Sequence, residues 1–244
     1  MGLDRQAHER VERSLFELES WFRDHLRRLR RDPGTDLLSA LVGMADDDGS
    51  GLTETELLAT AMLVFGAGFE TTVNLIGNGA AQLFAAPDQR RLLAEDPSLW
   101  GGAVDEVLRI DSPVQRTARR ARRDTTVHGV PVAAGELVVL VLAAANRDPQ
   151  VFSAPHEFDV TRANAQRHVA FSSGIHFCLG AALARMEGEV ALQALFERFP
   201  DLAPAGPPRR RSTVILRGYA AMPVRLSPAG SAPPTPAGQL PVTA

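Results

Sequence analysis

The sequence predicts a mainly α-helical protein with small β-sheets. Long apolar patterns recur at three- and four-residue spacing, whereas strand-like patterns are short and confined to a few segments. The 244 residues are 45% hydrophobic and 23% charged, which is typical of a globular protein with a sizeable core. We expect residues 1–226 to form one domain portion and residues 227–244, rich in Pro and Ala, to form a disordered tail.

The first expected element is an amphipathic helix over residues 5–31. Its apolar side chains recur at helical spacing: Leu15, Leu18, Phe22, Leu26 and Leu29. Its arginine-rich end suits a helix C-terminus, where the helix dipole favours positive charge. A short helix over residues 36–44 and a polar loop over residues 46–51 follow.

A long, nearly apolar helix is expected from about Thr53 to Ala85. Thr53 and Glu56 have the spacing of a capping box at its start. A nearly all-apolar surface predicts that the helix crosses the middle of the fold. One face carries a polar stripe at four-residue intervals: Glu70, Asn74, Asn78 and Gln82. Residues 57–86 are also long enough to span a membrane, but an acid at mid-span is costly in lipid, so we interpret them as a buried helix of a soluble protein.

The remaining elements are short. We expect helices over residues 88–95, 98–110 and 179–199, strands within 114–145, an irregular stretch over 146–175 and a hairpin over 212–226. So long an irregular stretch is unusual inside a compact domain and is often functional.

Charge and composition exclude several classes of protein. The formal net charge is -3, and a DNA-binding protein would have a basic footprint instead. One cysteine rules out an intramolecular disulfide framework and a multi-cysteine zinc site. The N-terminus has no apolar segment of the kind found in signal peptides. We therefore expect a cytoplasmic protein that binds neither nucleic acid nor membrane.

The lone thiol, Cys178, is the first candidate for chemistry. For a random cysteine, a small buried hydrophobe is the better interpretation. Here Cys178 lies at the start of a predicted helix, where backbone amides and the helix dipole favour a thiolate. Gly174 and Gly180 permit a turn and the close approach of a flat ligand. A thiolate below a planar apolar surface is what a haem iron requires.

Two further motifs contain paired polar groups. Glu70 and Thr71 follow Ala67-Gly68; they either face a water pocket or relay protons to something bound in a groove opened by the glycine. Glu106 and Arg109, three residues apart on a helix, resemble a routine surface ion pair. An arginine cluster is expected to be a solvated edge in which one member could bind an anion: Arg116, Arg119, Arg120, Arg122 and Arg123.

Together these features resemble the cytochrome P-450 family of haem-thiolate monooxygenases, and most closely its soluble bacterial members. The matching motifs occur in the family's order: Ala67 to Thr72, Glu106-x-x-Arg109, Asn146 to Pro149, Phe158 to Arg162, and Phe171 to Arg185. The resemblance runs from about Arg5 to Leu226. It begins with a helix like the one after the family's lid region, so it implies an N-terminally truncated member.

The resemblance implies a role for each matching residue. Cys178 would be the ligand to the iron of haem b, with Phe171 beside the thiolate and Gly174 and Gly180 under the porphyrin. His176 and Arg119 would hold the haem propionates. Further residues would form the oxygen groove (Ala67 and Gly68), the proton-delivering acid–alcohol pair (Glu70 and Thr71) and a buried structural network (Glu106, Arg109 and Arg162). This last role replaces the surface-pair interpretation of Glu106 and Arg109.

The implied reaction inserts one oxygen atom from O2 into an organic, apolar substrate, in secondary metabolism. The electrons would come from a ferredoxin and its NAD(P)H-dependent ferredoxin reductase. One alternative is a non-catalytic monooxygenase-like remnant or helper, which would bind a partner through an exposed central helix. A second alternative is a helical binding domain without haem.

Overall fold

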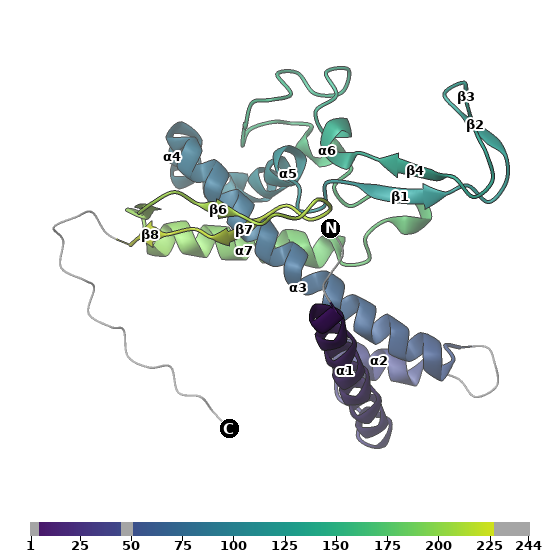
Figure 1. The fold of residues 1–244 in the computed structure, drawn as a ribbon. Helices are drawn as coiled ribbons and strands as arrows, with labels where there is room; N and C mark the ends of the chain where they lie inside the picture. The colour runs from purple at the N-terminus through teal and green to yellow at the C-terminus, as the bar shows by residue number, and fades with distance from the viewer. Residues whose placement is uncertain (1–4, 45–50, 227–244) are drawn as a thin grey trace. The chain divides into compact units, whose positions relative to one another are not determined.

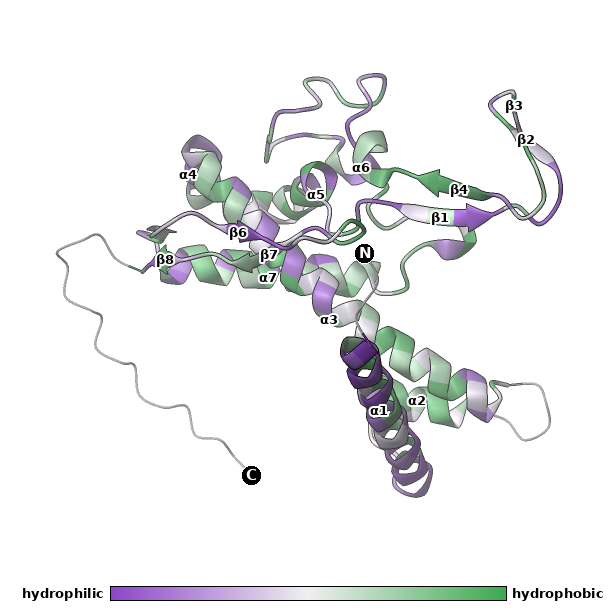
Figure 2. Ribbon diagram, viewed as in Figure 1, coloured by the Kyte–Doolittle hydropathy of each residue, from purple (hydrophilic) through white to green (hydrophobic). Residues whose placement is uncertain are grey.

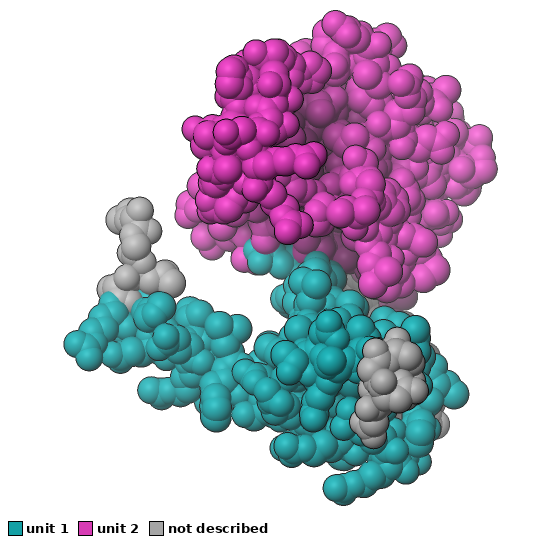
Figure 3. Space-filling model, turned by 90° about the vertical axis from the view of Figure 1, so that its right-hand side faces the viewer, with its two compact units in different colours: residues 1–70 teal, residues 71–244 magenta. Residues whose placement is uncertain are grey.

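The computed structural model describes residues 5–44 and 51–226. The chain divides into two compact units, residues 1–70 and 71–244, drawn in teal and magenta in Figure 3. The polar loop predicted for residues 46–51 lies almost entirely outside the described residues, and the predicted tail, 227–244, lies outside them completely. One domain portion over 1–226 stays a prediction. The predicted fold class is confirmed: the elements are helices and small antiparallel sheets (Figure 1).

The first unit contains α1 (Arg5–Arg31), α2 (Leu37–Gly43) and the beginning of α3 (Glu54–Ala85). Its core takes Phe22, Leu26 and Leu29 from α1, Val42 from α2, and Leu57, Leu58 and Ala61 from α3. The predicted bounds of α1 are confirmed, and its apolar stripe supplies three of these seven core residues.

A capping box opens α3, as predicted. The backbone N–H of Thr53 donates to Glu56 Oε2 at 2.9 Å, and that of Glu56 donates to Thr53 Oγ1 at 3.3 Å. These bonds satisfy backbone donors that have no partner inside the helix. At the start of α2, Asp36 accepts a bond from the N–H of Ser39 at 3.0 Å in the same way.

The middle of α3 is more exposed than the sequence predicts. Leu63 is 68% exposed and Phe69 72%, whereas Leu57 and Leu83 near the two ends are almost completely buried. Figure 2 shows how hydrophobic the first half of this helix is. By length and composition α3 could cross a membrane, with a window of mean hydropathy 1.3 that is 17% buried. The expectation of a helix buried throughout is therefore wrong, because the two cores receive residues from its ends only.

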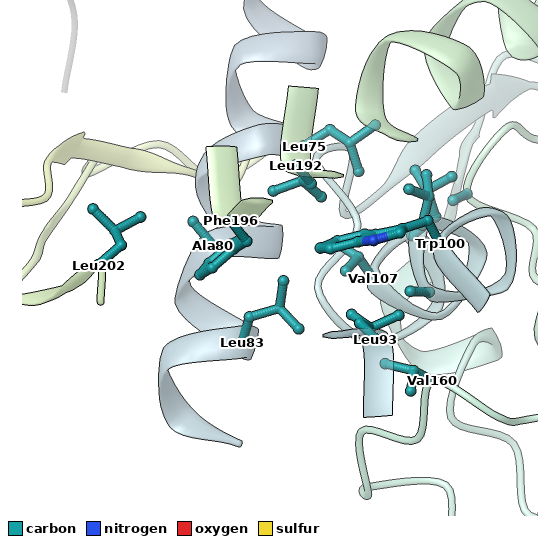
Figure 4. Close-up of a cluster of buried hydrophobic side chains, with 14 residues drawn as sticks. Leu75, Ala80, Leu83, Leu93, Trp100, Val107, Val160, Leu192, Phe196 and Leu202 are labelled. Carbon is teal, nitrogen blue, oxygen red and sulfur yellow. The ribbon is translucent and has the colours of Figure 1, made fainter. Parts of the chain in front are cut away.

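The core of the second unit lies among α3, α5 and α7 (Figure 4). The helical elements here are α4 (Pro87–Glu95), η1 (Pro97–Leu99), α5 (Trp100–Ile110), α6 (Leu142–Ala145), η2 (Ala165–Arg167), η3 (Gly174–His176) and α7 (Ala181–Arg198). Trp100 of α5 stacks on Phe196 of α7, with ring centroids 6.3 Å apart, and Phe84 of α3 meets the same ring edge-on at 5.7 Å. These aromatic contacts fix three helices around one cluster.

Two small antiparallel sheets occupy the region predicted to contain strands. β1 (Thr117–Arg120) pairs with β4 (Leu137–Leu140), and β2 (Thr125–Val127) pairs with β3 (Val130–Val132). His128 and Gly129, with φ values of 47° and 81°, form the turn between β2 and β3, as tight hairpins require. The predicted strand region is wrong at its end: Leu142–Ala145 is a helix, consistent with the high helix propensity of its three alanines.

The predicted hairpin over 212–226 is wrong. β7 (Tyr219–Ala221) pairs with β6 (Arg209–Arg210), and β8 (Val224–Arg225) pairs with β5 (Ala203–Pro204). Met222 and Pro223 separate β7 from β8. A two-residue hairpin turn needs a positive φ that the proline ring forbids and methionine disfavours, so each strand pairs with an earlier segment.

Candidate functional site

The candidate site centres on the loop that connects Phe171 to α7. Ser172 and Gly174 adopt left-handed backbone conformations, with φ values of 62° and 65°. The N–H of Cys178 then donates to the carbonyl of Phe171 at 3.0 Å, which closes the loop on itself. Helix α7 begins three residues later, at Ala181. The thiol is therefore held immediately before a helix start, as the sequence predicts.

The loop presents an open and apolar surface. Cys178 is exposed, Ile175 is 97% exposed and Leu179 85%. A Cβ atom placed on Gly174 or Gly180 would meet no other atom within 4 Å. The exposed apolar side chains and the open space at both glycines are features of a surface that a flat apolar group covers.

Phe171 anchors this loop within the second unit. The guanidinium of Arg185 lies 4.8 Å above the centre of the Phe171 ring, and the imidazole of His168 lies 5.5 Å from it. Both groups contact Asp105 of α5: Arg185 Nε donates to Oδ1 at 2.7 Å, and His168 Nε2 lies 3.2 Å from the same oxygen. Burial alone would raise the pKa of Asp105, but the hydrogen bonds and charges of His168 and Arg185 hold that pKa below its usual value.

The sequence did not identify this cluster as functional. Two signals pointed to it: Asp105 adjoins the Glu106-x-x-Arg109 motif, and Arg185 ends the segment that begins at Phe171. Neither signal says that the two residues meet, because 80 residues separate them in the chain.

The structure brings Glu106, Arg109 and Arg162 together in a buried network. Arg109 donates to Glu106 through Nε at 2.6 Å and through Nη2 at 2.7 Å, and Arg162 Nε adds a third bond at 3.1 Å. The side chains of Glu106 and Arg109 are 0% exposed. The remaining Arg109 donors reach backbone carbonyls of the irregular stretch, at Asn146, Pro155 and Glu157. The network therefore fixes a long irregular segment to α5.

The four candidate residues of α3 follow one another on an unbroken helix. Ala67 and Gly68 are exposed, and Glu70 and Thr71 are half-buried. Contrary to the sequence prediction, Glu70 therefore does not lie in a helix that is buried along its whole length, since the middle of α3 is exposed. The next residue, Thr72, donates to Glu187 Oε2 at 3.1 Å and so joins α3 to α7.

Arg119 and His176, the expected propionate-binding residues, lie on different elements of the second unit. His176 is exposed in η3. Arg119 is half-buried in β1, where its Nη1 donates to Thr117 Oγ1 at 3.0 Å and to the Ala118 carbonyl at 2.9 Å. Both partners are neutral, so they do not offset the positive charge of Arg119. Its guanidinium can therefore still bind an anion.

Comparisons with known proteins agree on one family. The family model described as Cytochrome P450 matches residues 99–214. A putative cytochrome P450 140 from Mycobacterium tuberculosis (strain ATCC 25618 / H37Rv) is 52% identical over 233 residues, covering 95% of this chain and 53% of the relative. The vitamin D(3) 25-hydroxylase of Pseudonocardia autotrophica is 50% identical over 216 residues, covering 87% and 53%. A solved structure, the bacillaene polyketide synthase cytochrome P450 PksS of Bacillus subtilis 168, has a TM-score of 0.86 at 38% identity, covering 93% of this chain and 59% of that one.

The chain belongs to the cytochrome P450 family, whose members are monooxygenases that bind haem. Within that family it is similar to bacterial proteins. The chain spans about half the length of the curated relatives it matches.

The described residues fit a haem on chemical grounds. Among residues 5–44 and 51–226, no group of three or more His, Cys, Asp or Glu side chains is arranged to hold a bare metal ion. A haem iron already has four porphyrin nitrogens and takes a single thiolate from the protein. One exposed cysteine, bordered by exposed apolar side chains and two glycines with open space, matches that requirement.

Proposed function

We propose that this chain acts in a haem-thiolate monooxygenase that inserts one oxygen atom from O2 into an apolar organic substrate. One observation carries the proposal: the only cysteine of the sequence is exposed at the start of α7, on a loop closed by its own backbone hydrogen bond. A structural cysteine would instead be buried and inert.

Cys178 would ligate the iron of haem b from the loop side. The family is itself a standard example of thiolate ligation, in which electron donation from the sulfur favours O–O cleavage. Phe171 would hold the loop beside the sulfur, and Gly174 and Gly180 would leave room for the porphyrin. The positive charge of Arg119 and the imidazole of His176 would bind the propionates through charge-assisted hydrogen bonds.

On α3, Glu70 and Thr71 would move protons to the reacting oxygen. A hydroxyl both donates and accepts a hydrogen bond, so Thr71 can pass on a proton that the Glu70 carboxyl supplies. Ala67 and Gly68 would form the groove for O2, where Gly68 has no neighbouring atom within 4 Å of a Cβ position. These roles rest on the family motif, which places all four residues on one helix.

The remaining assignments rest on the family resemblance and on similarity to the relatives. We infer cytoplasmic electron delivery by a ferredoxin and an NAD(P)H-dependent reductase. A role in secondary metabolism is supported by the similarity to a P450 of a polyketide synthase, and an apolar substrate by the similarity to a vitamin D(3) hydroxylase.

The test is the reduced, carbon-monoxide difference spectrum of the chain after haem is added. We expect a strongly red-shifted Soret band, because a thiolate ligand donates electron density to the iron. Cys178→Ala should abolish this band, whereas Ser173→Ala, in the same loop, should preserve it. A band typical of neutral ligation in the wild-type chain, or a red-shifted band that survives Cys178→Ala, would contradict the proposal.

A non-catalytic helper remains the second candidate. The exposed apolar side chains of Leu63, Phe65 and Phe69 on α3 favour it, since a surface of this kind suits a protein partner. It predicts a chain that takes up no haem in the same experiment.

A further inference from the structure

The contacts around Phe171 form a continuous path from α5 to the thiol. Asp105 lies at one end of this path, and its carboxylate is only 14% exposed. One of its oxygens, Oδ1, lies within hydrogen-bond distance of both His168 Nε2 and Arg185 Nε. Because the three groups come from α5, the irregular stretch and α7, Asp105 links three separate segments of the second unit.

The hydrogen bonds of His168 define its tautomer. The N–H of Ala170 donates to His168 Nδ1 at 3.1 Å, so Nδ1 is the acceptor and carries no proton. In the neutral ring the proton is then on Nε2, which donates to Asp105. The imidazole is 1% exposed and cannot turn without losing both bonds. Its face is thus fixed relative to Phe171.

Arg185 is fixed by the same carboxylate. Its guanidinium donates to Asp105 while lying over the Phe171 ring, a geometry that suits the planar guanidinium and not an ammonium group. Phe171 in turn accepts the N–H of Cys178 through its carbonyl, and its ring meets that of Phe177 edge-on at 6.4 Å. The contacts of His168 and Arg185 with Asp105 therefore converge on Phe171, whose carbonyl accepts the Cys178 N–H.

We propose that Asp105 is a positioning residue for the thiolate loop: through His168 and Arg185 it holds Phe171, and through Phe171 the backbone of Cys178. The effect that we expect on the reduction potential of a bound haem rests on the proposed function. When haem is bound, a firmly held loop keeps water away from the sulfur. Because reduction adds negative charge to the iron–sulfur pair, better solvation of a loosened loop favours the reduced form. Loss of Asp105 should therefore raise the reduction potential.

The first test needs no haem. Amide hydrogen exchange at Cys178 reports directly on its bond to the Phe171 carbonyl. We expect Asp105→Ala to accelerate this exchange by about tenfold or more, because local opening becomes easier. Asp105→Asn should give a smaller increase, and it serves as the milder variant should the alanine protein fold poorly. Glu95→Gln, which breaks the exposed Arg91–Glu95 pair on α4, should leave the exchange unchanged. Unchanged exchange in both Asp105 variants would overturn the proposal.

The second test uses the haem-loaded chain. We expect Asp105→Ala to keep the red-shifted carbon-monoxide band, but to raise the ratio of reduced to oxidised protein at a fixed potential by up to about tenfold, equivalent to 59 mV. Arg185→Lys should change the ratio in the same direction, since lysine keeps the charge and loses the planar contact. An unchanged potential in these variants would overturn the expected effect of Asp105 on the haem. Failure of the wild-type chain to form thiolate-ligated haem would refute the proposed function, whereas the exchange result would still decide the positioning role.

Discussion

Glu106 illustrates how a single residue can hold together distant parts of the chain. Its carboxylate accepts hydrogen bonds from Arg109, from Arg162 and from the N–H of Asp159 at 3.0 Å. Both Glu106 and Arg109 are buried completely. Removing the negative charge would leave buried guanidinium groups without their counterion, and breaking a buried pair in this way costs about 3–5 kcal/mol. We expect Glu106→Gln to lower the free energy of unfolding of the second unit by about that amount.

Urea denaturation of the wild-type chain and the variant measures this loss. The control is Glu95→Gln, because its partner Arg91 is exposed and such pairs contribute about 0–1 kcal/mol. If the two substitutions cost the same, the Glu106 network would not have the structural importance that its burial indicates.

For single residues, the sequence revealed which side chains could pair but not whether the pair would be buried. Glu106-x-x-Arg109 and Arg91-x-x-x-Glu95 are both unremarkable ion-pair spacings on helices, and spacing alone favoured an exposed pair for the first. Only the family resemblance assigned it a buried role. The burial depends on carbonyls of residues 146–157, which approach through tertiary structure and leave no trace in the local pattern.

Helix α3 shows that glycines within one element have different functions. A Cβ on Gly79 would lie 2.6 Å from Leu192 Cδ1, in the core between α3 and α7, whereas a Cβ on Gly66 would meet nothing within 4 Å. In an open helical position, Gly→Ala stabilises by about 0.5–1 kcal/mol. Overpacking a core costs about 1–3 kcal/mol.

We therefore expect opposite results from two matched substitutions in α3. Gly66→Ala should raise the free energy of unfolding by about 0.5–1 kcal/mol. Gly79→Ala should lower it by about 1–2 kcal/mol, which is the cost of overpacking minus the stabilisation that alanine gives the helix. Thermal and urea unfolding followed by circular dichroism would measure both. Stabilisation by Gly79→Ala would mean that Leu192 adopts another rotamer at little cost.

Element boundaries were predictable where local chemistry determines them. The capping box of Thr53 and Glu56 and the apolar stripe of α1 determine their helices without help from distant residues. The pairing of β7 and β8 was not predictable in this way, because their partners are earlier strands and the alternation of side chains is the same for any partner. The burial of α3 depends likewise on what covers it and not on its own composition.

Over the molecule as a whole, the ionisable groups predict a loss of stability in acid. The described carboxyl groups of Asp36, Glu56 and Asp105 have pKa values below their usual 3.8, 4.5 and 3.8. The N–H and hydroxyl of Ser39 lower the pKa of Asp36, and those of Thr53 lower the pKa of Glu56. For Asp105, burial raises the pKa, but the hydrogen bonds and charges of His168 and Arg185 together lower it by more.

A carboxyl whose pKa is lower in the folded state stabilises the fold above its unfolded pKa, and this contribution disappears as the pH falls through the folded value. We therefore expect the free energy of unfolding to be insensitive to these groups between about pH 7 and 5 and to fall as the pH drops below about 4.5. Protonating the acids also leaves the 26 Lys and Arg charges, all of them Arg, unbalanced, so repulsion adds to the loss. Urea unfolding between pH 2 and 7 should show the wild-type chain and Asp105→Asn differing most near neutral pH and converging in acid, because both then lack the Asp105 charge. A difference that stays constant across this range would mean that Asp105 contributes through packing and not through its charge.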